Sequence, residues 1–255
     1  MAIIENYTYR EFVEFANNRQ KHSECNKEYS RSDDFNFTQT DSFEQAIEFA
    51  TTGWDLGLEQ YKIEDGVLSS GTTHLNPSLA GCIPHVQNYI MGFPEQMYNL
   101  YDEREYNLPT LDLVIQLNYP ANLKGSETIE YGKSLVNYIN TMASTRNIRL
   151  TGIFCAEFDE GDVMKIVKLK DFDSPLVLNN IAFAFHPSFF RRLQFSICEG
   201  KSYWESGYGR SVDDYRQYLD KNIDGIKADE TKYFKGLRNI SEYSFTPDQV
   251  DEYTH

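Results

Sequence analysis

Four kinds of short motif in this sequence have residue types and spacing that could support chemistry or binding, and two of them could hold a metal ion. Cys82 and His85 form a Cys-x-x-His pair, which offers two of the four ligands of a structural zinc ion. On this half-motif alone we expect no metal. The acidic pairs at 33–34, 102–103 and 159–160 could bind Mg²⁺ or divide acid and base roles. Each pair lies in a loop-like context, where solvated carboxylates are far commoner than catalytic ones.

A third motif is basic. His186 and Pro187 are followed by the adjacent residues Arg191 and Arg192. Paired arginines hold phosphate or carboxylate groups bidentately, so this run could form a small anion pocket. The alternative is that the arginines complement the negative end of a helix that closes at His186. We favour this alternative because such complementation is routine.

A fourth motif has the features of a contact surface. Gly92 can end a short helix, and Pro94 stiffens the loop behind it. The loop would present Glu95 beside Met97, a flexible apolar side chain that adapts well at binding faces. The alternative is that Met97 packs into the core and Glu95 is solvated. The predicted binding residues are Gly92, Pro94, Glu95, Met97, His186, Arg191 and Arg192.

We predict no catalytic residue and no cofactor. The sequence contains no GxxxxGK[ST], GxGxxG, GxSxG or HExxH motif. Their absence excludes the familiar enzyme classes that carry these motifs, and it leaves other enzyme classes open.

The elements that must position these residues are clearest between residues 111 and 157. Leu111–Leu117 is rich in aliphatic residues and predicts a buried strand. Ser126 is the expected N-cap of an amphipathic helix, and Arg149–Glu157 is a second strand. Strand, helix and strand joined by short links predict a parallel βαβ unit. Residues 163–170 alternate and predict a further strand, or an exposed edge of one.

This unit also predicts part of the core. The apolar faces of its helix and strands should converge. We therefore expect Ile115, Leu135, Ile139 and Ile153 to be buried together.

Helix signals occur on both sides of the unit. A short helix is expected near Tyr9–Ala16, and Ser42 with Gln45 has the spacing of a capping box. Trp54 is interpreted as a core anchor. The alternating residues Leu193–Glu199 predict a strand.

The sequence beyond Ala228 is interpreted as a tail with a short helix at most. We divide the chain into a partly mobile N-terminal extension (1–40), an α/β domain (41–200), and a C-terminal helix and tail (201–255).

The layout of residues 111–157 resembles a von Willebrand factor A-type domain. In that family the first strand ends in Asp-x-Ser-x-Ser, which binds Mg²⁺ before an amphipathic helix and a second parallel strand. Here the strand is followed by Asn118–Asn122, which lacks the acidic residue and both serines. The resemblance implies a three-layer, mostly parallel sheet, degenerate von Willebrand A-like or otherwise doubly wound, with extra N-terminal helices. It also implies that the metal site is lost and a scaffold for protein contacts is kept.

Residues 41–200 also resemble an uncharacterised family, a domain of unknown function carried by bacteriophages and prophage regions. The resemblance rests on SFEQAIEFATTGWDLGLEQ, HVQNYIMGFPEQM, the strand–helix–strand segment and IAFAFHPSFFRRLQFSICE, in that order. It includes G-x-P-E-x-M from Gly92 and H-P-x-x-x-R-R from His186. The resemblance implies a phage-type origin and carries no activity with it.

Charge and composition narrow the partners. The formal net charge is −15, with 39 acidic against 24 basic side chains, which argues against coating of duplex nucleic acid. No apolar run approaches the roughly 20 residues that span a bilayer, and the first residues lack the features of a signal peptide. The four cysteines lie far apart, as in proteins that keep their thiols reduced. We therefore expect no membrane association and a cytoplasmic location, in the host cytoplasm if the protein is phage-encoded.

The function that these observations favour is that of a phage accessory protein that binds another macromolecule, without catalysis. A protein partner is favoured by the charge. The alternatives are an unrecognised enzyme with its site at the C-terminal ends of the strands, and a structural component of a virion. The oligomeric state stays open.

Overall fold

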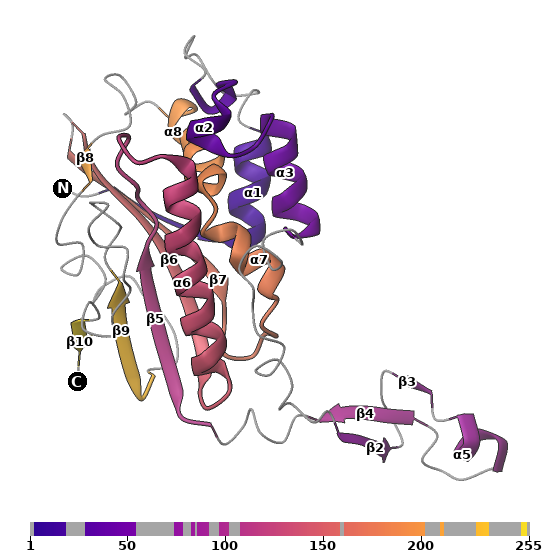
Figure 1. Cartoon of the computed structure of the whole chain (residues 1–255). Coiled ribbons are helices and arrows are strands. Elements are labelled where there is room, and N and C mark those ends of the chain that lie inside the picture. Colours follow the sequence, from indigo (N-terminus) through magenta and orange to yellow (C-terminus); the bar gives the residue numbers. More distant parts are fainter. Residues whose placement is uncertain are drawn as a thin grey trace.

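The structure of the chain is a computed structural model. The structure describes residues 3–18, 29–54, 74–78, 83–84, 86–91, 97–101, 108–158, 161–201, 210–211, 228–234 and 251–253. Within these ranges the strands form a seven-stranded sheet and a separate three-stranded sheet. Helices pack against the larger sheet, so the fold class is α/β, as the sequence predicts (Figure 1).

The larger sheet is mixed, whereas a mostly parallel sheet was predicted from the sequence. Its strands are β1 (Ile3–Thr8), β5 (Thr110–Gln116), β6 (Asn147–Phe158), β7 (Gly161–Lys170), β8 (Arg210–Ser211), β9 (Glu230–Phe234) and β10 (Asp251–Tyr253). They lie in the order β1-β7-β6-β5-β9-β10, and β8 pairs with the end of β6. The pairs β1–β7, β5–β6 and β5–β9 are parallel. The pairs β6–β7, β6–β8 and β9–β10 are antiparallel.

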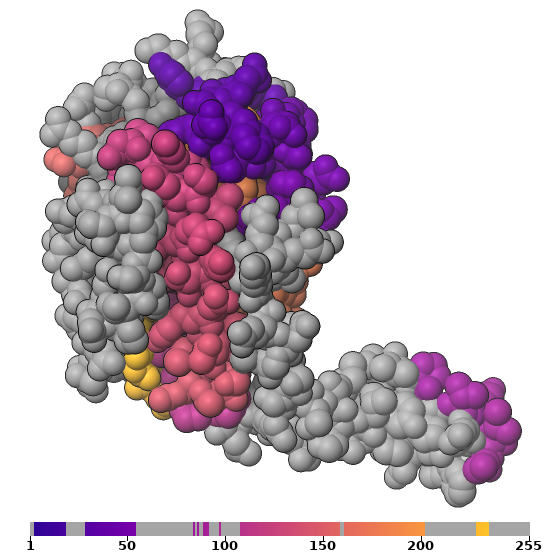
Figure 2. All heavy atoms as spheres, in the orientation of Figure 1, coloured from indigo at the N-terminus to yellow at the C-terminus, as the bar shows by residue number. Residues whose placement is uncertain are grey.

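The helices belong to one large hydrophobic core with one face of this sheet. They are α1 (Tyr9–Asn18), α2 (Phe35–Thr38), α3 (Phe43–Thr52), α6 (Gly125–Ala143), α7 (Leu178–Ala184), the π-helix η3 (Phe189–Gln194) and α8 (Phe195–Glu199), with a 3₁₀ turn η2 (Tyr29–Arg31). Figure 2 shows the N-terminal residues, in indigo, lying directly beside the magenta residues of α6. Segments distant in sequence therefore share one core.

The predicted βαβ unit is present, since α6 connects the parallel neighbours β5 and β6. Its helix begins earlier than predicted. Lys124, rather than Ser126, is the N-cap, and its backbone N–H donates to the Glu127 carboxylate at 2.7 Å. A glutamate at this position satisfies a free N–H and favours the positive end of the helix.

Three of the four residues expected to be buried together are in one cluster. Ile115, Leu135 and Ile139 belong to the large core, but Ile153 is buried in a smaller cluster with Val114. The register pairs Ile115 with Gly152, and successive residues of a strand point to opposite faces of the sheet. Ile153 therefore faces away from α6, and this part of the prediction was wrong.

Three other elements differ from the sequence-based expectation. Leu193–Glu199 is helical, in η3 and α8, instead of a strand. Glu230–Phe234, expected in a tail, forms strand β9 beside β5. Strand β1 was not anticipated, and it places the predicted strand of residues 163–170 in the interior of the sheet, between β1 and β6.

The three-stranded sheet consists of β2 (His74–Ser78), β3 (Ile83–Pro84) and β4 (Met97–Tyr101), with the short helix α5 (Val86–Met91). In Figure 1 it lies apart from the larger sheet. The predicted short helix before Gly92 is therefore present, and its residues Val86, Tyr89, Ile90 and Met91 are exposed.

Among the helices that the structure describes, none has the length and apolar character needed to cross a membrane.

Candidate functional site

Arg191, one of the predicted binding residues, is fully buried in η3. Its Nη1 donates to the Phe37 carbonyl at 2.7 Å, and its Nη2 donates to the carbonyls of Pro120 and Leu123, both at 2.9 Å. The guanidinium lies 3.9 Å from the centre of the Phe37 ring. Burial lowers the pKa of Arg191 to about 10. This side chain fastens the loop after β5 to helix α2.

Arg192 is also fully buried, and it binds the segment between η2 and α3. Its Nε donates to Thr40 Oγ1 at 2.6 Å, and its Nη1 donates to the Ser30 carbonyl at 3.1 Å. Its Nη2 donates to Thr38 Oγ1 at 3.0 Å and to the Thr40 carbonyl at 2.9 Å. Burial lowers the pKa of Arg192. The hydrogen-bond acceptors of the Arg192 guanidinium are thus neutral oxygens of the chain itself.

A buried carboxylate completes the same network. Glu199 accepts hydrogen bonds from the backbone N–H of Ser30 at 2.8 Å and from its hydroxyl at 2.7 Å. The hydroxyls of Thr40 and Ser188 share a hydrogen bond of 2.7 Å. Residues 29–41 are thus held to η3 and α8 by polar contacts. The anion-binding role of the two arginines stays a prediction.

His186 is buried between aromatic rings. Its ring centre lies 4.4 Å from that of Trp54 and 5.5 Å from that of Phe183. Its Nδ1 accepts a hydrogen bond from the Ser188 N–H at 3.1 Å, so the neutral ring carries its proton on Nε2. Burial and, to a lesser extent, the nearby Arg192 lower the pKa of His186 to about 3. The imidazole is therefore neutral across the physiological range.

This neutral histidine makes stability depend on pH. The unfolded chain binds a proton at this histidine below pH 6.5, its ordinary pKa, whereas the folded chain does not bind one until about pH 3. The neutral His186 therefore contributes fully to the free energy of unfolding above pH 6.5, and this contribution is lost as the pH falls towards 3. We expect His186→Asn, whose amide oxygen can replace Nδ1 as acceptor, to remove about 2 kcal/mol of the stability loss between pH 7 and 5. Urea titrations of both chains measure this, and parallel pH profiles would contradict it.

The remaining predicted binding residues lie in or near the three-stranded sheet. Met97 begins β4 and is half-buried, in register with Ser78 and Pro84. Gly92, Pro94 and Glu95 lie outside the described residues. Their predicted role as a contact surface stays a prediction.

The candidate metal residues can be placed only in part. Cys82 and His85 lie outside the described residues, as do the acidic pairs at 102–103 and 159–160. The sequence holds a second histidine–cysteine pair at the same spacing, His22 and Cys25. The prediction of no zinc did not consider this pair, and it also lies outside the described residues. Among the described residues, no group of three or more His, Cys, Asp or Glu side chains could hold a metal ion.

Two polar side chains that the sequence singled out have structural roles. The Asp34 carboxylate accepts a hydrogen bond from the Phe37 N–H at 3.3 Å and caps α2. Asn118, at the end of β5, is buried, and its Oδ1 accepts a hydrogen bond from the Cys155 N–H at 2.8 Å. This amide oxygen joins the end of β5 to β6.

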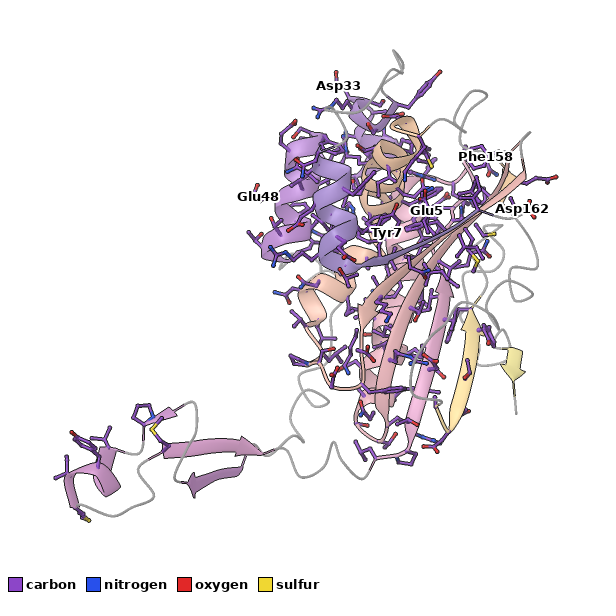
Figure 3. The ribbon with its side chains drawn as sticks, turned by 180° about the vertical axis from the view of Figure 1, so that it is seen from behind. Glu5, Tyr7, Asp33, Glu48, Phe158 and Asp162 are labelled. Atoms are coloured by element: carbon purple, nitrogen blue, oxygen red, sulfur yellow. The ribbon has the colours of Figure 1, made fainter. Side chains whose placement is uncertain are left out.

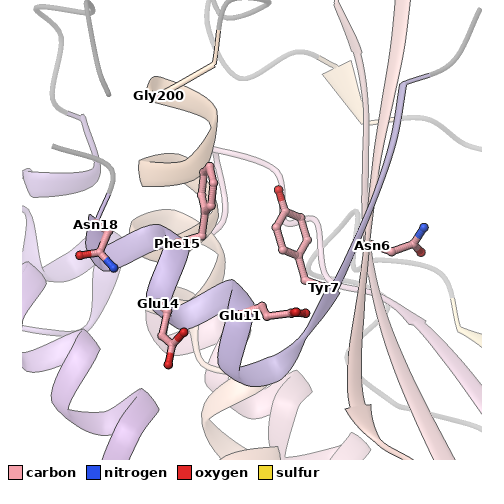
Figure 4. Close-up of a pocket in the computed structure, with 7 residues that line it drawn as sticks. All are labelled: Asn6, Tyr7, Glu11, Glu14, Phe15, Asn18 and Gly200. Carbon is pink, nitrogen blue, oxygen red and sulfur yellow. The ribbon is translucent and has the colours of Figure 1, made fainter. Parts of the chain in front are cut away.

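A pocket of about 460 Å³ lies where α1 turns back from β1. Its lining residues, drawn in Figure 4, are Asn6, Tyr7, Glu11, Glu14, Phe15, Asn18 and Gly200. The turn is fixed by a capping box, in which the Glu11 N–H donates to Thr8 Oγ1 at 3.2 Å and the Thr8 N–H donates to the Glu11 carboxylate at 2.8 Å. The T-x-x-E spacing was a readable sign of this helix start.

Two residues that line the pocket, Tyr7 and Phe15, contact charged groups beside it. The Tyr7 hydroxyl donates to the Glu5 carboxylate at 2.9 Å, and Figure 3 shows both side chains on β1. Burial and Glu5 raise the pKa of Tyr7. The ammonium of Lys201 lies 2.8 Å from Glu5 and 4.7 Å from the centre of the Phe15 ring. An ammonium group therefore lies between the Glu5 carboxylate and the ring of Phe15, which lines the pocket.

Two buried cysteines lie in the described core. The Cys198 sulfur lies 3.1 Å from the Lys165 ammonium and 3.2 Å from the Gln194 amide nitrogen. Burial raises the pKa of Cys155 to about 12. Because the thiolate is the reactive form, Cys155 is an inert core thiol at neutral pH.

Comparison with known proteins gives one match. No curated protein and no solved structure is similar enough to this chain to match it. A family of unknown function matches residues 4–253, which is wider than the resemblance over residues 41–200 that the sequence motifs suggest. The chain belongs to this family, the domain of unknown function DUF7192.

Proposed function

We propose that this chain acts by binding a protein partner, without catalysis, at the surface around the β1–α1 pocket. The observation that carries the proposal is an open pocket lined by one exposed large apolar side chain, with a second one exposed on the same strand, β1. Phe15, which lines it, is 38% exposed, and Ile3 on β1 is 43% exposed. Exposed apolar residues beside a concave surface with a polar rim are typical of protein interaction sites.

The titratable groups of the pocket favour binding over chemistry. The raised pKa of Tyr7 keeps its phenol protonated at neutral pH, so the phenol is a poor base. Glu11 caps α1, and its hydrogen bonds from Thr8 lower its pKa, so its carboxylate stays ionised. Glu14 pairs with the exposed Arg10 at 2.7 Å. Such groups can recognise a ligand without transferring a proton to it.

The enzyme alternative placed its site at the C-terminal ends of the strands. At the end of β5, the carbonyls of Pro120 and Leu123 accept hydrogen bonds from the buried Arg191. Asn118 is bonded to the backbone of β6. These contacts use the polar groups of this loop for structure, which favours the binding function over chemistry at this edge.

Three finer statements belong to the same proposal. The phage-type origin rests on the resemblance of the motifs around Gly92 and His186. The cytoplasmic location rests on the composition. The three-layer, von Willebrand A-like arrangement rests on the resemblance of residues 111–157, and the parallel βαβ unit of β5, α6 and β6 supports the likeness of this segment alone.

The proposal is tested by photo-crosslinking. A benzoylphenylalanine placed at Phe15 in the full chain should form an adduct with one protein when cells that make the chain are irradiated. The same photoreactive residue at Phe35, which is 49% exposed and lies outside the pocket lining, is the matched control. The partner, once purified, should bind the Phe15→Ala chain at least about tenfold more weakly than wild type, as expected for loss of an aromatic anchor. Equal adducts from both positions, or equal affinities, would contradict the proposal.

A further inference from the structure

We propose that the edge of β1 opposite β7, with which no described strand pairs, receives an extended, basic segment of the partner as an added strand, with one of its side chains in the pocket. This inference rests on the proposed function and specifies the chemistry of the partner. In such strand addition, main-chain hydrogen bonds provide affinity, and pockets for alternate side chains provide specificity.

The first step is that β1 has an unpaired edge among the described strands. It is the terminal strand of the sheet order, and its described neighbour is β7. The N–H groups of successive residues in a strand point alternately to its two edges. The Thr8 N–H donates to Glu11 rather than to β7. By this alternation, the N–H groups of Ile4 and Asn6 also point away from β7.

The second step is that the pocket lies at this edge. Figure 4 shows Asn6 and Tyr7 projecting to opposite sides of β1, and both residues line the pocket. Adjacent residues of a strand face opposite sides of the sheet. A pocket that contacts both residues must therefore extend around one edge of the strand. One edge of β1 is bonded to β7, so the pocket extends around the opposite edge. An added strand would lie along the mouth of the pocket.

The third step is that β1 itself carries none of three common edge-blocking features. Exposed edges are commonly blocked by lysine, proline or a bulge. Residues 3–8 (IIENYT) contain neither lysine nor proline, and their register with β7 is unbroken. Their one charged residue, Glu5, is paired with Lys201.

The fourth step is the charge of the segment. Lys201 shows that an ammonium group fits against Phe15 and a carboxylate in this part of the fold. Glu14 lines the pocket, and its ion pair with Arg10 is exposed and so is easily exchanged for another cation. With a net charge of −15, the chain attracts basic segments and repels a second copy of itself. A basic partner strand is therefore favoured over pairing of two β1 edges.

The test uses a fluorescent peptide of about ten residues that alternates valine and lysine, a length typical of a β-strand. Fluorescence anisotropy should show saturable binding to the wild-type chain. Asn6→Pro removes an N–H at the edge opposite β7, whereas Asn6→Ala removes the same side chain and keeps that N–H, so the proline chain should bind at least about tenfold more weakly than the alanine chain. Glu14→Lys should weaken binding about fivefold or more, whereas Glu130→Lys, in an exposed ion pair on α6, should not.

A second probe keeps the protein unchanged, so that it does not depend on folding of the proline variant. A version of the same peptide with N-methyl groups on every second residue lacks backbone N–H donors along one of its two edges. Methylation can start at the first or at the second residue, and one of these two peptides should lose its affinity. No binding of the valine–lysine peptide, while the Phe15 adduct forms, would overturn the added strand and leave the proposed function standing. Equal binding by the Asn6→Pro and Asn6→Ala chains would do the same. If sedimentation shows a dimer of the wild-type chain and Asn6→Pro abolishes it, the segment that pairs with β1 belongs to a second copy of the chain and not to a basic partner.

Discussion

Replacing Arg192 with methionine is expected to lower the free energy of unfolding by about 3–5 kcal/mol. The methionine fills most of the same space but donates no hydrogen bond. The carbonyls of Ser30 and Thr40 and the hydroxyl of Thr38 would then lose a buried donor. Each buried acceptor left unpaired costs roughly 1–3 kcal/mol, and relief from desolvation of the guanidinium offsets part of that sum.

Urea unfolding of the full chain measures this effect. Arg192→Lys should recover little stability, because an ammonium cannot span acceptors arranged for a planar fork. Arg10→Met is the matched control, since Arg10 is 87% exposed in an ion pair on α1 and its loss should leave the midpoint unchanged. An unfolding midpoint for Arg192→Met within error of wild type would mean that residues 29–41 are not fastened by this side chain.

Replacing Phe189 with alanine is expected to cost about 3–5 kcal/mol, the usual range for a buried aromatic truncation. Phe189 is fully buried at the centre of the aromatic core. Its ring centre lies 5.0 Å from that of Phe12, 5.8 Å from that of Tyr9 and 5.9 Å from that of Phe183. These rings come from α1 and α7, so the cavity would loosen several elements together.

The control for this truncation is Phe35→Ala. Phe35 is 49% exposed, so its removal leaves a much smaller cavity and should cost a small fraction of the same loss. The two variants are compared by urea titration at one pH. A loss of less than about 1 kcal/mol for Phe189→Ala would show that the aromatic rings repack around the gap.

Sequence periodicity was sufficient for the central βαβ unit. The apolar run of β5, the apolar face of α6 and the run of β6 are local patterns, and each carries its own period. Chain length between strands then favours the parallel pairing that the structure has. The same pattern predicts that Ile153 is buried, but only the register with Gly152 places it on the second face.

Elements that depend on distant partners were not predictable in the same way. In β9, Glu230 and Lys232 mask the strand signal, and only Tyr233 and Phe234 are buried. Its pairing with β5 comes from far along the chain. Leu193–Glu199 alternates in sequence, yet it lies in a helix that is buried on every side, where no single apolar stripe is needed.

The pocket illustrates the same limit. The spacing of Thr8 and Glu11 indicates the start of α1, but no local pattern shows that α1 folds back beside an edge strand. Gly200 reaches the pocket only because α8 packs against α1. The paired arginines were recognised as unusual from sequence, while their carbonyl partners lie between 68 and 162 residues away.

The central claim, that β1 offers a free edge to an added strand, is tested most directly by amide hydrogen exchange resolved for each residue of β1. In the free chain the Ile4 and Asn6 amides should exchange fast, while those of Glu5 and Tyr7, directed towards β7, should be protected. Saturation with the valine–lysine peptide should slow exchange at Ile4 and Asn6 by at least about tenfold, because each gains a main-chain hydrogen bond. Protection of Ile4 and Asn6 already in the free chain, or no change on binding, would contradict the account.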